Sequence, residues 1–167
     1  MNLFFLRHAK AEPRSDKYKP DAKRPLTRLG EEITTQVAKG MVRLDLGFDL
    51  IITSPYVRAV RTAELTAGVL KTDKVWASET LGSDGDPKKL IAVINENYGS
   101  LENILLVGHE PYMSKLMSVL LIGDSDLQIN FKKSGLANLS IEDLRYGKCA
   151  TLEWLLTPRQ LQRLGKK

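Results

Sequence analysis

The sequence has one cysteine, two histidines and few aromatic residues, and these scarcities exclude several classes of protein. Cys149 has no partner for an internal disulfide, which fits a reducing compartment, and a structural zinc site needs more cysteines or histidines. No apolar run approaches the roughly 20 residues that span a bilayer. The apolar segment at the N-terminus is short and ends in Arg-His, so we predict a cytoplasmic protein without a signal peptide or membrane contact.

The remaining composition is that of a globular protein, with 43% apolar and 27% charged residues. At 167 residues we expect one domain, spanning residues 1–167. The net charge of +5 is compatible with anionic substrates, but the basic residues are scattered and do not alternate with stacking rings. This pattern disfavours a nucleic-acid surface. No predicted element is too apolar for one molecule, so we expect a monomer.

Buried strands and amphipathic helices alternate through the first two thirds of the chain. The predicted strands are 3–6, 48–53, 75–77 and 103–107. Helical spacing of apolar residues predicts a helix after each of them, at about 27–44, 56–70, 87–98 and 112–121. Polar loops are predicted at 10–25 and 78–86. This order is typical of a mostly parallel sheet with helices on both faces.

The C-terminal third has a different pattern. Apolar and polar residues alternate over 127–131, 137–141 and 152–156, and Tyr146-Gly147 separates the last two segments. We predict that these two form a hairpin, followed by a short helix at 158–164. The predicted fold class is therefore α/β, a three-layer α/β/α arrangement whose mostly parallel central sheet has an antiparallel edge.

Two of the predicted helices have an apolar stripe that we expect to face the core. The stripe of the first helix is Leu29, Ile33, Val37, Met41 and Leu44, and that of the second is Val57, Val60, Ala63, Ala67 and Leu70. Gly30 lies in the first turn of the first helix, where it costs about 1 kcal/mol relative to alanine. A neighbouring element that approaches closely would explain its presence there.

Both histidines directly follow buried parallel strands. His8 comes after the first strand and His109 after the fourth, and the carboxyl ends of such strands are where open α/β sheets bind ligands. Arg7 precedes His8, and Arg58 lies in the first turn of the helix that follows the second strand. Arginine matches phosphate oxygens, and a helix N-terminus also favours an anion. Arg61, one turn later, is interpreted as a solvated helix arginine.

Four segments resemble motifs of the histidine phosphatase superfamily, which has the phosphoglycerate mutase-like fold. Leu6-Arg7-His8-Ala9 resembles the Arg-His-Gly motif, and 54–62 resembles Ser-Pro-x-x-Arg-Ala-x-x-Thr. Gly108-His109-Glu110-Pro111 is similar to the segment that contains the second histidine. Arg24-Pro25-Leu26-Thr27-Arg28-Leu29-Gly30 resembles a stretch of the compact SixA-type phosphohistidine phosphatases.

The resemblance implies a catalytic site without metal or cofactor. His8 would be the nucleophile that becomes phosphorylated, and water would then hydrolyse the phosphohistidine. Arg7, Arg58 and His109 would hold the phosphate oxygens, with Arg24 as a further phosphate-binding candidate.

This chain departs from the family pattern at two points. Ala9 stands where glycine is usual, which is tolerated unless the backbone there needs a positive φ. Larger members use an acid from an insertion after the third strand, and the corresponding region here is short. It contains Glu79, Asp84 and Asp86, of which Asp86 is explained as a helix cap and Glu79 as loop surface. We predict Asp84 as the proton donor.

The short loop leaves the predicted pocket uncovered, which favours a bulky substrate such as a phosphohistidine side chain on a protein. Phosphohistidine also has a leaving group that is easily protonated. The alternatives are a phosphatase of small phosphate esters with the same core, or a phosphate-binding module without activity. A degenerate module would be expected to lack one of the core residues, and this chain retains Arg7, His8, Arg58 and His109.

Overall fold

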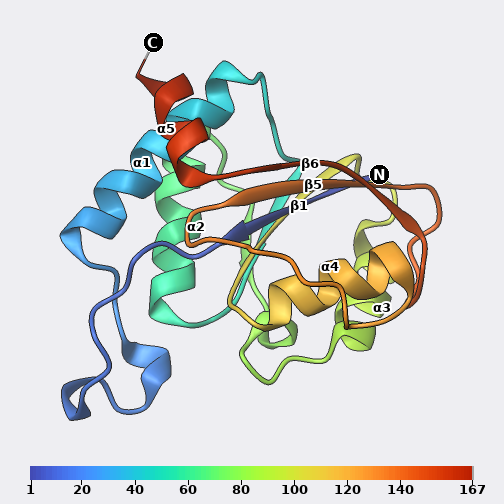
Figure 1. Ribbon diagram of the computed structural model, residues 1–167, viewed down its shortest axis with the longest axis horizontal. Coiled ribbons are helices and arrows are strands. Elements are labelled where there is room, and N and C mark those ends of the chain that lie inside the picture. Colours follow the sequence, from blue (N-terminus) through green and yellow to red (C-terminus); the bar gives the residue numbers. More distant parts are fainter. Residues whose placement is uncertain (167) are drawn as a thin grey trace.

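The computed structural model describes residues 1–166 and contains a six-stranded sheet between two layers of helices (Figure 1). The strands are β1 (Asn2–Arg7), β2 (Leu50–Thr53), β3 (Val75–Ala77), β4 (Asn103–Gly108), β5 (Leu136–Ile141) and β6 (Ala150–Leu156). The helices are α1 (Arg28–Arg43), α2 (Val57–Leu70), α3 (Pro87–Tyr98), α4 (Tyr112–Ile122) and α5 (Pro158–Gly165). Among residues 1–166, no helix has the length and apolar content needed to cross a membrane.

The strand order across the sheet is β3-β2-β4-β1-β5-β6. The first four strands in this order pair in parallel, whereas β5 is antiparallel to β1 and β6 is antiparallel to β5. The predicted fold class, a mostly parallel sheet with an antiparallel edge, is confirmed.

Each face of the sheet is covered by its own set of helices. Figure 1 shows α1, α2 and α5 on one face, and α3 and α4 on the other. Side chains of β1 alternate between the two cores: Leu3 and Phe5 pack with the α3 and α4 side, and Phe4 and Leu6 with the α1, α2 and α5 side. All four are buried, so β1 is a central strand whose apolar run ends where the sheet ends.

The core face of the first two helices differs from the predicted stripes. Leu29 and Leu44 in and after α1 are 49% and 37% exposed, and Val57 of α2 is 42% exposed. The buried face of α1 instead includes Gly30 and Gly40. In α1 these glycines, rather than large side chains, face the neighbouring backbone, and Leu29 and Leu44 are turned toward solvent. The prediction that Leu29, Leu44 and Val57 face inward was wrong.

Both glycines of α1 lie against backbone carbonyls. A Cβ atom at Gly30 would overlap the carbonyl oxygen of Lys10, and one at Gly40 would overlap that of Leu161 in α5. The N–H of Thr27, the N-cap of α1, also donates to Lys10 O at 2.9 Å. The close approach predicted for Gly30 is confirmed, and it fixes the chain that leaves β1 against the start of α1.

The alternating segment 127–131 does not belong to the sheet. The N–H of Leu127 donates to the hydroxyl of Ser118 in α4, and the carbonyl of Phe131 accepts from Arg7. The Phe131 ring is buried, whereas Leu127 is 38% exposed. The alternation therefore reflects an extended segment that packs on α4 through side chains and crosses the end of β1.

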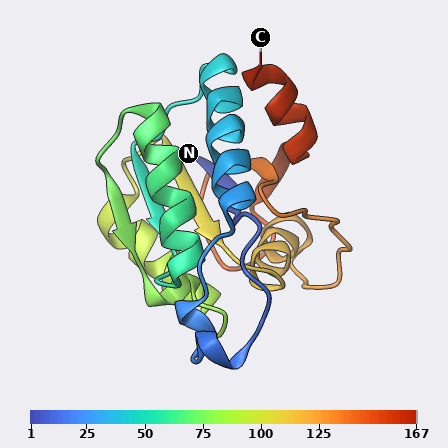
Figure 2. The same ribbon diagram turned by 90° about the vertical axis from the view of Figure 1, so that its left-hand side faces the viewer.

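The predicted loop at 10–25 is an excursion from the carboxyl end of β1. It contains two short 3-10 turns, Asp16–Tyr18 and Asp21–Lys23, and it closes where Ala11 bridges to Leu26. Figures 1 and 2 both show this segment, in blue, projecting beyond the end of the sheet beside the start of α2. It brings its polar side chains over the end of β1.

The packing of α1 on α5 generates a test of stability. Alanine normally stabilises a helix by about 1 kcal/mol relative to glycine, yet we expect Gly40→Ala to lower the free energy of unfolding by about 1–3 kcal/mol because its methyl group overpacks the interface. Gly68→Ala in α2 is the matched control, because a Cβ there meets no atom within 4 Å. Urea denaturation measures both, and a Gly40→Ala protein as stable as Gly68→Ala would contradict the packing.

Candidate active site

Parallel pairing of β1 with β4 places the two histidines side by side. Arg7 is in register with Gly108, and the N–H of His8 donates to Gly108 O at 3.0 Å. The ring centroids of His8 and His109 are 5.0 Å apart, and both residues are more than 90% buried. The sheet therefore brings together two residues that are 101 positions apart in the sequence.

A backbone hydrogen bond defines the tautomer of His8. Its Nδ1 lies 2.7 Å from the carbonyl oxygen of Ala9, which is an acceptor only. Nδ1 must therefore hold the proton and donate, which leaves the lone pair on Nε2. Burial lowers the pKa of His8 to about 3, and repulsion from the neighbouring His109 imidazole, whenever that ring is protonated, lowers the pKa further. His8 is thus neutral at physiological pH, with Nε2 available as a nucleophile.

Ala9 fits without strain at the position where glycine was expected. Its φ is not in the positive range, its side chain is buried, and its N–H donates to Thr62 Oγ1 at 3.3 Å. The Thr62 hydroxyl in turn donates to Arg58 O at 2.7 Å. Thr62 therefore connects the turn after β1 to the first turns of α2, which gives the threonine of the second motif a structural role.

His109 is held by the second motif. Its Nε2 lies 2.7 Å from the hydroxyl of Ser54, which is fully buried at the end of β2, and its Nδ1 is buried without a partner among the described residues. The Tyr56 ring is 4.8 Å from the His109 ring and 5.0 Å from the Arg58 guanidinium carbon. Burial lowers the pKa of His109 to about 3, with the charge of Arg58 contributing, so this imidazole is also neutral.

Arg58 is buried and is oriented by Asp21 from the 10–25 excursion. Arg58 Nη2 pairs with Asp21 Oδ2 at 3.0 Å, and Nη1 donates to Asp21 O at 2.9 Å. Burial lowers the pKa of Arg58, and the charge of Asp21 opposes that shift. The same carboxylate accepts from Arg24 Nε at 2.8 Å, which holds the pKa of Asp21 below its usual value. One carboxylate thus positions two arginines.

Arg7 is held by the segment that precedes β5 and not by the 10–25 excursion. Its Nη1 donates to Phe131 O at 2.7 Å, and its Nε is buried without a partner among residues 1–166. Burial lowers the pKa of Arg7, and the nearby Glu110 carboxylate opposes that shift. Lys133 completes this side: burial lowers its pKa, and the charge of Arg7 adds to the effect. No carboxylate among residues 1–166 lies within ion-pair distance of Lys133.

These side chains line one polar cavity of about 270 Å³. Its lining residues are Arg7, His8, Arg14, Asp21, Arg24, Arg58, Ser83, His109, Glu110 and Lys133. Five cationic side chains face two carboxylates, and the two imidazoles are neutral. Buried N–H groups of Arg7 and Arg58 have no partner within the described chain. Surplus positive charge and unpaired donors suit a compact dianion such as a phosphoryl group.

The cavity contains five of the six residues predicted for the site: Arg7, His8, Arg24, Arg58 and His109. Asp84 is exposed and lies outside the lining, where its neighbour Ser83 is found instead.

The other polar residues weighed from the sequence lie outside the cavity as well. Glu79 is exposed, and Asp86 accepts from Lys88 N as the N-cap of α3. Arg61 pairs with Glu31 of α1 at 2.6 Å and is not a cavity residue.

The sequence analysis missed several residues of the cavity, chiefly Asp21, Glu110, Arg14 and Lys133. Glu110 directly follows His109, and its Oε1 accepts from Ser114 N at 3.0 Å. The signal for Glu110 was its place within the third motif. Asp21 precedes Arg24 by three residues, a spacing that allows an ion pair in a turn, whereas nothing in the local sequence indicates Arg14 or Lys133.

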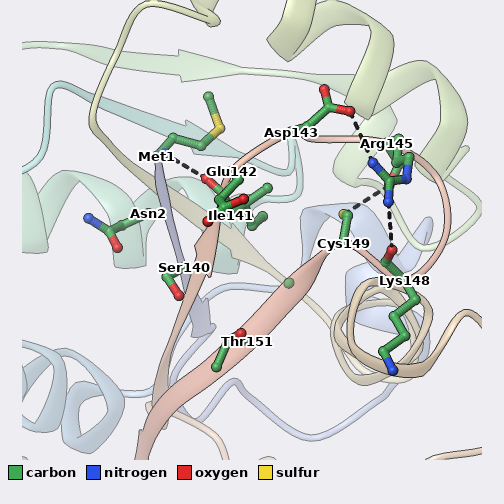
Figure 3. A pocket seen from close by; sticks show the side chains of 11 residues that line it. Met1, Asn2, Ser140, Ile141, Glu142, Asp143, Arg145, Lys148, Cys149 and Thr151 are labelled. Carbon is green, nitrogen blue, oxygen red and sulfur yellow. Dashed lines mark hydrogen bonds and ion pairs between the residues drawn. The ribbon is translucent and has the colours of Figure 1, made fainter.

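A larger concavity of about 700 Å³ lies at the turn between β5 and β6, near the N-terminus (Figure 3). The Met1 ammonium donates to Ile141 O at 2.8 Å, and Arg145 pairs with Asp143 at 3.0 Å. Figure 3 shows Lys148 and Cys149 beside this pair. The side chains that line this concavity have mixed charges, and neither histidine is among them, so its chemistry differs from that of the anion pocket. Among residues 1–166, no cluster of three or more histidine, cysteine or acidic side chains has a metal-binding arrangement.

Sequence and structural comparisons identify relatives of this chain. Residues 3–81 match the model of the histidine phosphatase superfamily, branch 1. An uncharacterized protein of Picosynechococcus sp. is 33% identical over 140 residues, which is 83% of this chain and 84% of that protein. The chain belongs to the histidine phosphatase superfamily.

Solved structures share the fold over nearly the whole chain. The protein histidine phosphatase SixA, complexed with tungstate, superposes with a TM-score of 0.83 at 23% identity, covering 96% of this chain and 99% of that one. A SixA homologue of Agrobacterium tumefaciens gives 0.77 at 22% identity, covering 94% and 97%. An α-ribazole phosphatase of Shigella flexneri gives 0.74 at 21% identity, covering 95% and 97%.

The burial of both imidazoles generates a prediction about pH. Because burial penalises the charged form, we expect His8 and His109 of the free protein to stay neutral as the pH falls from 7 to about 4 and to titrate near 3. The unfolded chain takes up these protons near pH 6.5, so the free energy of unfolding should fall as the pH drops below that value. Imidazole NMR shifts measure the titration directly, and midpoints near 6.5 would contradict the burial.

Proposed function

We propose that this protein is a phosphatase that hydrolyses phosphohistidine on a protein substrate through a covalent intermediate on His8. The observation that carries the proposal is the hydrogen bond from His8 Nδ1 to Ala9 O, which leaves Nε2 unprotonated within a cavity of surplus positive charge. Membership of the superfamily supports phosphatase activity, and the likeness to SixA structures supports this substrate class.

The reaction has two displacement steps at phosphorus. In the first, Nε2 of His8 forms a bond to phosphorus, the bond from phosphorus to the substrate imidazole breaks, and that imidazole takes up a proton. In the second, a water oxygen attacks phosphorus, the bond to Nε2 breaks, and inorganic phosphate leaves. His8 leaves as a neutral imidazole, and the proton that water loses replaces the one given to the substrate imidazole in the first step. The Nδ1 proton stays directed at Ala9 O through both steps and keeps the His8 ring in place.

Arg7, Arg58 and His109 are proposed to bind the non-bridging phosphate oxygens, with Arg24 contributing through the same anion pocket. Phosphoryl transfer requires little covalent chemistry from the protein, so donors placed in advance supply most of the stabilisation. Arg58 is held by Asp21 and Arg7 by Phe131 O, which means that neither guanidinium needs to reorganise when the substrate enters. Removing one such donor typically costs 10²–10³-fold in rate.

The proton donor for the leaving group is proposed from two acids. Asp84 is an exposed residue of the loop after β3, next to Ser83 at the cavity, whereas Glu110 lines the cavity itself. A protonated imidazole is a good leaving group without enzyme assistance, so loss of the acid should matter most for alkyl phosphate esters. We expect Asp84→Asn or Glu110→Gln, whichever removes the donor, to slow an alkyl phosphate at least tenfold more than p-nitrophenyl phosphate. Equal effects on both substrates would exclude that residue as the donor.

A phosphatase of small phosphate esters is the second candidate. The fold likeness to an α-ribazole phosphatase favours it, since that protein has the same fold and is named for a small phosphate ester. The short loop at 78–86 favours the protein substrate, because this segment between β3 and α3 contributes only Ser83 to the lining of the cavity.

Comparison of two substrates tests the proposed function. We expect wild type to hydrolyse a phosphohistidine-bearing phosphotransfer protein with a kcat/KM well above that for p-nitrophenyl phosphate, and His8→Ala to lose both activities by at least 10³-fold. His8→Ala removes the nucleophile but leaves the arginines in place, so it should still bind inorganic phosphate. Far faster hydrolysis of small esters than of phosphohistidine would favour the second candidate, and turnover that survives in His8→Ala would exclude His8 as the nucleophile.

A further inference from the structure

A second cavity of about 540 Å³ opens beside the phosphate pocket. The two cavities share Arg14, Asp21 and Ser83, so they adjoin each other along these residues. One wall of the second cavity is the segment 14–21 of the excursion, and Tyr56 with Ser83 forms the other. We call this cavity the 14–21 groove. The 14–21 groove therefore has room for the part of a substrate that lies beyond its phosphoryl group.

The size of the groove exceeds what a small phosphate ester requires. The phosphate pocket itself measures about 270 Å³, and a cavity of 540 Å³ beyond it is within the range that holds a whole drug-sized ligand. A phenyl ring or a single imidazole would leave most of this space to water. A stretch of polypeptide on either side of a phosphorylated residue would fill it.

The lining of the groove combines two aromatic rings with the cations Arg14 and Lys19 and the carboxylates Asp16 and Asp21. Tyr18 is half-buried, and Tyr56 lies beside both Arg58 and His109 of the phosphate pocket. Arg14 is 85% exposed, and its only ion pair among the described residues is with Asp21 at 3.8 Å. Lys19 is 75% exposed and pairs with the exposed Asp16, an interaction that solvent weakens.

We propose that the 14–21 groove binds the polypeptide that flanks the phosphorylated histidine, and that Arg14 and Lys19 select partners with acidic residues beside that histidine. The inference rests on the proposed function and adds the recognition of the substrate to it. Asp21 is already held by Arg58 and Arg24, and the Lys19–Asp16 pair is exposed to solvent. Both flexible cations can therefore exchange their weak contacts for the carboxylates of an acidic segment. The uncharged base of a nucleoside phosphate would offer neither cation a new charged partner.

The experiment uses substrates that differ only outside the phosphoryl group. The first is a phosphohistidine peptide with aspartate and glutamate beside the histidine, the second has asparagine and glutamine in their place, and the third is phosphoimidazole. The variants are Lys19→Glu and Tyr18→Ala, which lie in the groove and not in the phosphate pocket. Lys74→Glu is the matched control, because Lys74 is an exposed lysine just before β3, at the opposite end of that strand from the site.

We expect wild type to prefer the acidic peptide over the neutral one. Lys19→Glu should lower kcat/KM for the acidic peptide about fivefold, which corresponds to about 1 kcal/mol, and should remove most of the preference. Tyr18→Ala should lower kcat/KM for both peptides. Both variants should hydrolyse phosphoimidazole within about twofold of wild type, and Lys74→Glu should match wild type on all three substrates.

Several results would overturn the inference. Equal losses on phosphoimidazole and on the peptides would show that the groove serves the phosphoryl group alone, and an unchanged preference in Lys19→Glu would exclude charge selection. Better turnover of a nucleoside monophosphate, dependent on Tyr18, would assign the groove to a small molecule. If wild type hydrolyses p-nitrophenyl phosphate but none of the three phosphohistidine substrates, the proposed function itself fails, which is a distinct outcome.

Discussion

The register between β1 and β4 is the constraint on which the site depends. Because Arg7 lies opposite Gly108, the residues that follow are placed side by side, and each strand delivers its histidine at the same edge of the sheet. A shift by one residue would turn every side chain of β1 to the other face. The register is held by burial on both sides, since Leu3 and Phe5 fill one core while Phe4 and Leu6 fill the other. The burial of β1 on both faces therefore stabilises the sheet and also aligns the two histidines.

Electrostatic compensation explains why cationic side chains can be placed so close together. A buried guanidinium without a partner is costly, and Arg58 is 3% exposed. Asp21 supplies a carboxylate and a carbonyl to Arg58, while its other oxygen accepts from Arg24. The two histidines avoid the same cost by remaining neutral. The pocket therefore keeps a positive excess at its mouth, where Lys133 and Arg14 have little compensation, and this excess is what would attract a phosphorylated partner.

The sequence predicted most of the fold, because strands buried on both faces are continuous apolar runs that end abruptly. It also placed His8 and His109 at one edge of the sheet, since parallel strands present their carboxyl ends together. The helix faces were less predictable: Leu29 and Val57 are exposed because α1 and α2 pack through small residues, and a pattern of large apolar side chains does not reveal that. Asp21 was missed because its role arises from a contact with Arg58, 37 positions away, which no local spacing encodes.

The site residues were found mainly because their motifs resemble those of a family, and the structure adds the physical reasons for several of them. Ser54 anchors His109, and Thr62 joins the turn after β1 to α2. Neither residue lines the cavity, yet Ser54 contacts the His109 imidazole that does. Asp84 remains a prediction as the proton donor, and its position on an exposed loop outside the cavity makes Glu110 the alternative acid.

Rapid quenching during turnover tests the central claim most directly. The protein would be mixed with a 32P-labelled phosphohistidine substrate, quenched in base to preserve phosphohistidine, and mapped by mass spectrometry. The account predicts an acid-labile phosphoryl group on Nε2 of His8 during turnover, and none in His8→Ala. Label on His109, or full turnover with no labelled protein at any time, would contradict it.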